Sequence, residues 1–129
     1  MPVTDPRPWG RPEPEERSRA YFTTQDVESD IRRLCSMLDG KIDEHGEASM
    51  RSARADVAYK NAHERALLVA EGSNAEQREA WAHSQVEAEY LERKIADRME
   101  HAIEEAARNI RAQLSALQSI AATQRALAS

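Results

Sequence analysis

Residues 75–129 read AEQREAWAHSQVEAEYLERKIADRMEHAIEEAARNIRAQLSALQSIAATQRALAS, a stretch that contains no glycine and no proline. Its apolar residues recur at intervals of three and four, which is the spacing of one face of an α-helix. A helix of ~50 residues is ~75 Å long at ~1.5 Å per residue. We expect the apolar side of such a helix to need a partner, supplied by a hairpin in the same chain, by another subunit, or by both.

The composition also indicates long helices. Ala, Glu, Lys, Leu and Arg make up 64 of the 129 residues, near the ~50% that is typical of long helices and coiled coils. Leu, Ile, Val and Phe number 20, which is too few to build a deep pocket. The sequence therefore predicts an all-α fold, a long helical hairpin or coiled coil. It has no glycine-rich phosphate loop, nucleophile elbow or cysteine pair, so we expect no enzyme and no cofactor.

Charge and cysteine content limit the possible partners. The chain has 18 basic and 23 acidic residues, a formal charge of −5, which argues against a dedicated duplex-DNA binder. Its single cysteine, Cys35, fits a reducing compartment. No apolar run reaches the ~18 residues that cross a membrane. We expect a cytoplasmic protein without a membrane partner.

Proline and glycine mark the expected boundaries. All five prolines lie in the first fourteen residues, so residues 1–20 are predicted to be a disordered tail. Residues 21–129 are predicted to be one helical domain. Its expected helices cover about 24–44, 47–71 and 75–127.

The caps of these helices follow from local signals. Thr23 or Thr24 can cap the first helix. A break near Gly46 separates the first helix from the second, and Gly72 ends the second. Asn74 can cap the third helix, and the short turn makes the second and third helices antiparallel neighbours.

A seven-residue repeat appears in the last part of the third helix. Ile103, Ile110, Leu117 and Gln124 share one position, and Ala106, Gln113, Ile120 and Leu127 share the other. Glutamine in such a seam can fix register and partner number. We predict a homo-oligomer that pairs through Ile103, Ala106, Ile110, Gln113, Leu114, Leu117, Ile120 and Leu127.

The four histidines do not predict a metal site. A helical di-metal centre needs Glu-x-x-His steps, and the sequence contains none. His45, His63, His83 and His101 lie among surface charges, so we expect no metal.

A possible nucleic-acid surface lies around the end of the second helix. Single-strand binders combine cations that follow the backbone with aromatic rings that stack on bases. The candidates here are Arg51, Arg54, Tyr59, Lys60, Arg65 and Arg78. The alternative is an ordinary mixed-charge face, because Asp56, Glu64, Glu71 and Glu79 dilute these cations.

The segments AYKNAHERALL (58–68), EGS (71–73) and EQREA (76–80) resemble small helical proteins of tailed bacteriophages. That group is distantly similar to the UvsY-type recombination mediators, which bind single-stranded DNA and help to load a recombinase. The resemblance covers residues 47–127. It implies an oligomeric accessory protein of phage DNA recombination or replication in the host cytoplasm, with Tyr59, Lys60, Arg65 and Arg78 as DNA contacts.

A second reading comes from another class of protein. The chain can be a structural or adaptor coiled-coil protein that binds a host or virion protein and does not contact nucleic acid.

Overall fold

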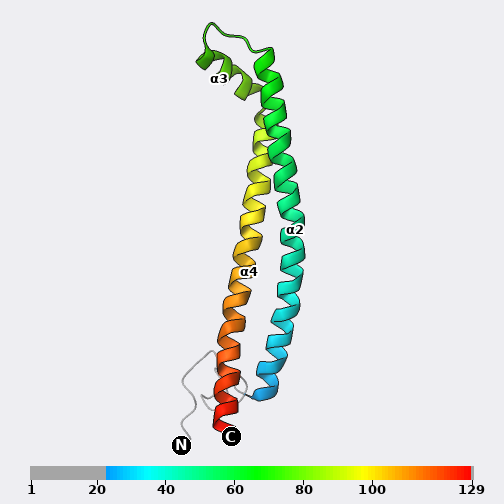
Figure 1. Ribbon diagram of the computed structural model, residues 1–129, viewed down its shortest axis with the longest axis vertical. Helices are drawn as coiled ribbons and strands as arrows, with labels where there is room; N and C mark the ends of the chain where they lie inside the picture. The colour runs from blue at the N-terminus through cyan, green and yellow to red at the C-terminus, as the bar shows by residue number, and fades with distance from the viewer. Residues whose placement is uncertain (1–22, 129) are drawn as a thin grey trace, which may run out of the picture. The chain divides into compact units, whose positions relative to one another are not determined.

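The computed structural model describes residues 23–128, and the predicted tail at residues 1–20 lies outside this range. The described residues form three helices and no strand (Figure 1): α2 (Thr24–Leu68), α3 (Ala75–Gln85) and α4 (Glu87–Ala128). The prediction of an all-α fold is confirmed.

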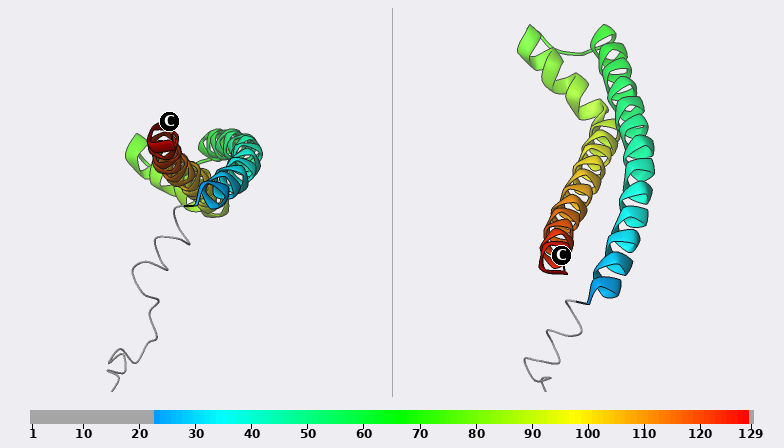
Figure 2. Two further views of the ribbon diagram at one scale, coloured as in Figure 1. Left: turned by 90° about the horizontal axis from the view of Figure 1, so that it is seen from below. Right: turned by 60° about the horizontal axis from the view of Figure 1, so that its bottom comes forward.

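The chain divides into two compact units, each of which contains part of α2 and part of α4. One unit is Leu38–Ile110, and the other contains residues 23–37 and 111–128. Within Leu38–Ile110, Arg51 bonds to Glu92 and His45 bonds to Glu104. Positions on α4 therefore decrease as their contact positions on α2 increase, so the two segments are antiparallel and form a hairpin. The chain passes from α2 to α4 through α3, which lies at the connected end of the hairpin (Figure 2).

Helix α2 begins where the sequence predicts. The Thr23 carbonyl accepts the first helical bond from Val27 N–H at 3.1 Å, and the Thr23 hydroxyl accepts from Asp26 N–H at 3.3 Å. The Thr23 hydroxyl also donates to the Asp26 carboxylate. Thr23 is thus the N-cap, and Asp26 lies in the positive first turn.

The predicted break at Gly46 is wrong, because α2 runs without interruption from Thr24 to Leu68. Glycine keeps its backbone N–H, so it weakens a helix by ~1 kcal/mol without removing a hydrogen bond. The neighbouring residues carry the helix through Gly40 and Gly46. The expected pair of helices, 24–44 and 47–71, is therefore one helix.

The turn between α2 and α3 confirms Asn74 as the cap of the following helix, whereas α2 ends at Leu68, before the predicted end at residue 71 and four residues before Gly72. After Leu68, the Val69 N–H donates to the Ala66 carbonyl and the Ala70 N–H donates to the Leu67 carbonyl. Both bonds span three residues, which makes a tight last turn. Gly72 has a φ of +151°, which favours glycine. Asn74 Oδ1 accepts from Gln77 N–H at 2.8 Å, and Gln77 Oε1 accepts from Ser73 N–H at 2.9 Å. This reciprocal pair fixes the start of α3.

The third predicted helix, 75–127, is interrupted at Val86 and forms α3 and α4. Val86 has φ −118° and ψ +26°, and its N–H bonds to His83 at 3.2 Å. Helical bonding resumes from Tyr90 N–H to the Val86 carbonyl at 2.9 Å. Ala82 and Val86 are both buried, so we attribute the change of direction to the packing of these two side chains, which a helical pattern in sequence does not reveal.

Burial follows one alternating three- and four-residue pattern along each long helix, which we call the inner seam. Near the ends of the chain, in the unit of residues 23–37 and 111–128, it is largely apolar. Within Leu38–Ile110 it is mainly alanine and polar residues. On α2 the inner seam is Val27, Ile31, Leu34, Leu38, Lys41, His45, Ala48, Ser52, Ala55, Tyr59, Ala62 and Ala66. Opposite it the inner seam begins at Val86, just before α4, and continues on α4 with Glu89, Arg93, Ala96, Glu100, Ile103, Ala107, Ile110, Leu114, Leu117, Ala121 and Gln124.

Candidate functional site

Two of the predicted DNA-contacting cations are engaged inside the chain. Arg51 donates to Glu92 Oε1 at 2.7 Å and to the Met99 sulfur at 3.3 Å. Lys60 pairs with Asp56 at 2.9 Å, one helical turn away. Both pairs are solvent-exposed and individually weak, but a phosphate would have to compete with them.

The predicted stacking platform, Tyr59, is half-buried at the inner seam. Its ring centroid is 5.8 Å from both the His63 and Tyr90 rings. The Arg93 guanidinium lies 5.0 Å from the Tyr59 centroid, at cation–π distance. Tyr59 therefore packs in a cluster that joins α2 to α4, and it does not present an open face for a base.

Asp56 anchors the same cluster. Arg93 Nε is 2.9 Å from Asp56 Oδ1, which adds a bond between α4 and α2. The hydrogen bond from Lys60 lowers the pKa of Asp56 below its ordinary value, with smaller contributions from the charges of Lys60 and Arg93, against an opposing effect of desolvation. Asp56 is thus ionised at neutral pH and holds both cations.

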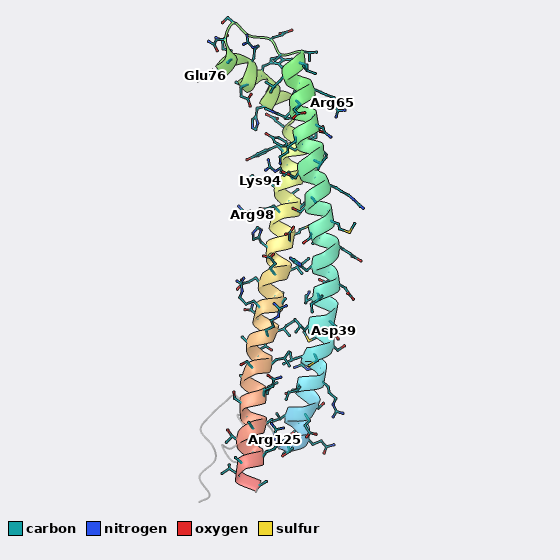
Figure 3. The ribbon with its side chains drawn as sticks, in the orientation of Figure 1. Asp39, Arg65, Glu76, Lys94, Arg98 and Arg125 are labelled. Carbon is teal, nitrogen blue, oxygen red and sulfur yellow. The ribbon has the colours of Figure 1, made fainter. Side chains whose placement is uncertain are left out.

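The remaining three DNA candidates are Arg54, Arg65 and Arg78. All three are exposed, and none forms an ion pair or side-chain hydrogen bond with another residue of the range 23–128. Figure 3 labels Arg65 near the end of α2. Of the six predicted contacts, these three are the cations available to a ligand.

The predicted oligomer seam has two heptad positions. The residues at one of them belong to the inner seam, and the residues at the other do not. Ile103, Ile110 and Leu117 belong to the inner seam, as does Leu114, and Ile110 and Leu114 are buried within the chain. At the second position, the inner seam uses Ala107, Leu114 and Ala121. The predicted residues Ala106, Gln113, Ile120 and Leu127 lie beside it. Ala107 and Ala121 were missed because alanine gives a weak hydrophobic signal.

Large apolar side chains also remain exposed on α4, away from the inner seam. Leu91 is 59% exposed, Ile95 41% and Met99 45%. With Ala88 and Ala102, which are also exposed, they form what we call the outer stripe: Ala88, Leu91, Ile95, Met99 and Ala102. At 100° per residue, these five positions fall within 80° of one another around an ideal helix.

Part of the outer stripe borders a shallow groove. The groove has a volume of about 310 Å³ and is lined by Lys94, Ile95, Arg98, Met99 and Ala102. Lys94 and Arg98 lie one helical turn apart on α4 (Figure 3). The groove therefore has an apolar floor with positive charge along one flank.

A second depression lies in the unit of residues 23–37 and 111–128. It is about 480 Å³ and is lined by Ser119, Ile120, Thr123, Gln124 and Leu127. Ile120 and Leu127 are two of the predicted oligomer contacts, and Leu127 is 81% exposed.

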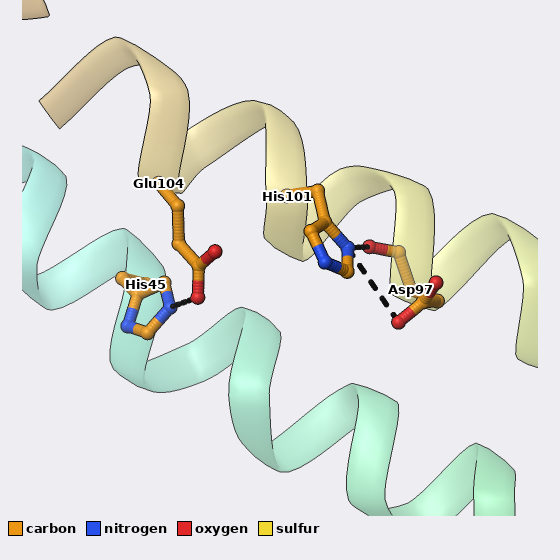
Figure 4. Close-up of polar contacts among 4 residues, drawn as sticks. All are labelled: His45, Asp97, His101 and Glu104. Carbon is orange, nitrogen blue, oxygen red and sulfur yellow. Dashed lines mark hydrogen bonds and ion pairs between the residues drawn. The ribbon is translucent and has the colours of Figure 1, made fainter. Parts of the chain in front are cut away.

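Two of the histidines, His45 and His63, form contacts between helices that their sequence spacing does not indicate. His45 Nε2 is 3.0 Å from Glu104 Oε1, although the two residues are 59 positions apart. His101, which precedes Glu104 by three, instead places Nδ1 2.8 Å from the Asp97 carbonyl oxygen (Figure 4). His63 pairs with Glu79 at 2.8 Å and links α2 to α3.

His101 has a shifted pKa. The hydrogen bond to the Asp97 backbone raises the pKa of His101 above its ordinary value, and the charges of Asp97, Glu104 and Glu100 raise it further, against an opposing effect of desolvation. Its imidazole therefore holds its proton to higher pH than an isolated histidine.

Among residues 23–128, no helix combines the length and apolar character needed to cross a membrane. Comparisons with protein-family models, with curated proteins and with solved structures found no match.

Proposed function

We propose that this chain is a non-enzymatic helical adaptor that self-associates through the outer stripe of α4. The supporting observation is that Leu91, Ile95 and Met99 remain 41–59% exposed although α4 already has a complete inner seam. Exposed apolar residues gathered on one face are typical of interaction sites. Because other residues fill the seam within the chain, the outer stripe remains available to a partner, apart from the Met99 sulfur, which accepts a hydrogen bond from Arg51.

The spacing of the outer stripe favours a second copy of the same chain as that partner. Its residues follow at intervals of three, four, four and three, so the stripe reads the same in both directions about Ile95. Its ends are small, and its three central residues are large. In an antiparallel two-fold dimer, Ile95 meets its own counterpart, and Leu91 meets Met99. Self-complementarity of this kind is what a two-fold interface requires.

The test compares two matched substitutions. Ile95→Glu places two carboxylates opposite each other at the two-fold axis, and such like-charge contacts cost several kcal/mol. Ile42→Glu makes the same change on α2 at a residue that is 50% exposed and outside the stripe. By light scattering coupled to size exclusion, we expect Ile95→Glu to be monomeric and Ile42→Glu to retain the wild-type mass. Equal masses for the two variants would contradict the proposal.

A second candidate function rests on the three uncommitted arginines. An accessory protein of phage DNA recombination or replication, acting in the host cytoplasm, would bind single-stranded DNA through Arg54, Arg65 and Arg78, alone or with a recombinase. Three cations per chain give weak binding, which self-association would strengthen through avidity. The engaged state of Arg51, Lys60 and Tyr59 is why we place this function second.

Salt dependence separates the two functions. We expect an oligonucleotide complex to weaken steeply as salt rises, since phosphate binding releases counterions. Fluorescence anisotropy with a labelled single strand measures this effect. Replacing Arg54, Arg65 and Arg78 together by Gln should abolish binding, whereas Arg108→Gln, which removes a cation that pairs with Glu105 at 2.7 Å, should not. No binding by the wild type at low salt would remove the DNA function and leave the adaptor function standing.

A further inference from the structure

A cluster of potential metal ligands joins α2 to α4 inside the unit Leu38–Ile110. It consists of His45 on α2 and Glu100 and Glu104 on α4, all three half-buried. One ligand atom from each residue lies within 4.8 Å of the other two. Figure 4 shows the His45 ring and the Glu104 carboxylate facing each other across the two helices.

The distances fit a shared ion. His45 Nε2 and Glu104 Oε1 are 3.0 Å apart. Two donors that each lie ~2.1 Å from one tetrahedral Zn²⁺ are separated by ~3.4 Å, so a shift of a few tenths of an ångström would bring both atoms to bonding distance. Glu100 precedes Glu104 by one helical turn, so both carboxylates leave the same side of α4. The Glu100 carboxylate has an oxygen within 4.8 Å of both other ligand atoms, so Glu100 is the third candidate ligand.

The charges of the cluster also favour a cation. Two carboxylates one turn apart repel each other. Glu100 and His45 occupy inner-seam positions, where an alanine or leucine would pack without this repulsion. A divalent ion would neutralise both carboxylates and use the imidazole lone pair.

We propose that His45, Glu100 and Glu104 bind one divalent transition-metal ion of the Zn²⁺ class. Imidazole ligation selects Zn²⁺ and its neighbours over Mg²⁺ and Ca²⁺, which prefer oxygen ligands. Three protein ligands leave a coordination position for water. The ion clamps α2 to α4 where the inner seam is polar, and it stabilises the fold by mass action.

Other histidines of the chain provide controls. His101 lies on the same helix near Glu104, but its Nδ1 is engaged with the Asp97 carbonyl. His63 faces a single carboxylate, that of Glu79. Neither residue belongs to the three-ligand cluster, so His101→Ala and His63→Ala keep the site intact.

The experiment uses the full chain with Zn²⁺ or Co²⁺ alone. We expect calorimetry to give one ion per chain, bound Co²⁺ to give visible absorption, and Zn²⁺ to raise Tm. His45→Ala, Glu100→Gln and Glu104→Gln should each weaken binding by at least ~10-fold, the lower end of the loss from disturbing a metal site. Glu100→Gln and Glu104→Gln preserve side-chain shape, so they report on ligation even where His45→Ala lowers stability.

Three results would overturn the metal site. They are no saturable binding by the wild type, unchanged affinity in the Glu104→Gln variant, or an equal loss of affinity in the His101→Ala or His63→Ala variant. The outcome is independent of self-association, because Ile95→Glu leaves all three ligands in place and should bind the metal as the wild type does.

Discussion

His101 shows how one side chain makes stability depend on pH. Its pKa is raised above the ordinary value by the Asp97 backbone hydrogen bond and by neighbouring carboxylates. A group whose folded pKa is raised stabilises the fold fully below its unfolded pKa, ~6.5 for histidine. That contribution is lost as the pH rises through the folded pKa.

We therefore predict that His101→Gln lowers Tm at pH 5.5 and has a smaller effect at pH 8.5. Thermal unfolding of variant and wild type at both pH values measures this difference. Asp97→Asn is the control, because it removes the carboxylate and keeps the backbone carbonyl, so part of the pH dependence should remain. A loss of Tm that is equal at pH 5.5 and pH 8.5 is the contradictory result.

Residue-level signals in the sequence are reliable where the interaction is local. Thr23 and Asn74 are caps because their side-chain oxygens reach backbone N–H groups two or three positions away. The contact between His45 and Glu104 spans 59 positions and depends on the register of two helices. The sequence carries no local signal for it, and so we did not expect a ligand cluster there.

At the scale of the helices, glycine has opposite effects at two places. A side-chain carbon added at Gly46 meets no atom within 4 Å, and Gly46 lies inside α2. At Gly72 the same carbon would lie 2.9 Å from the Arg78 backbone nitrogen, at a φ of +151°. The first glycine weakens a helix that forms regardless, whereas the second is required by the turn.

Gly46→Ala should therefore raise the free energy of unfolding by about 1 kcal/mol, the usual difference between the two residues in a helix. Gly72→Ala should lower it, because the turn cannot accept a side chain. Chemical denaturation of the two variants alongside the wild type provides the comparison. Destabilisation by Gly46→Ala would mean that α2 is not continuous there.

Helix type and approximate position follow from the sequence, because long apolar periodicity and strong caps act locally. The register is harder to predict. Apolar residues identify the inner seam at Leu34 and Ile110, but between Lys41 and Ala66 the seam consists of alanine and polar residues. These residues resemble a surface in sequence, and burial there depends on the partner helix.

At the scale of the molecule, an apolar contact between two copies and a charge contact with DNA respond differently to salt. Lys94 and Arg98 flank the outer stripe, so two antiparallel copies bring these cations near one another. Raised salt screens that repulsion and should not weaken the dimer. Each chain also carries a formal charge of −5, so two copies repel each other. Raised salt screens this repulsion as well, and it should therefore favour the dimer.

The most direct test of self-association is sedimentation equilibrium of the wild-type chain over a dilution series. The chain has a mass of 14.5 kDa. We predict a mass that approaches twice this value at high concentration and falls toward 14.5 kDa on dilution. A mass of 14.5 kDa at every concentration would show that the outer stripe of α4 does not join two copies.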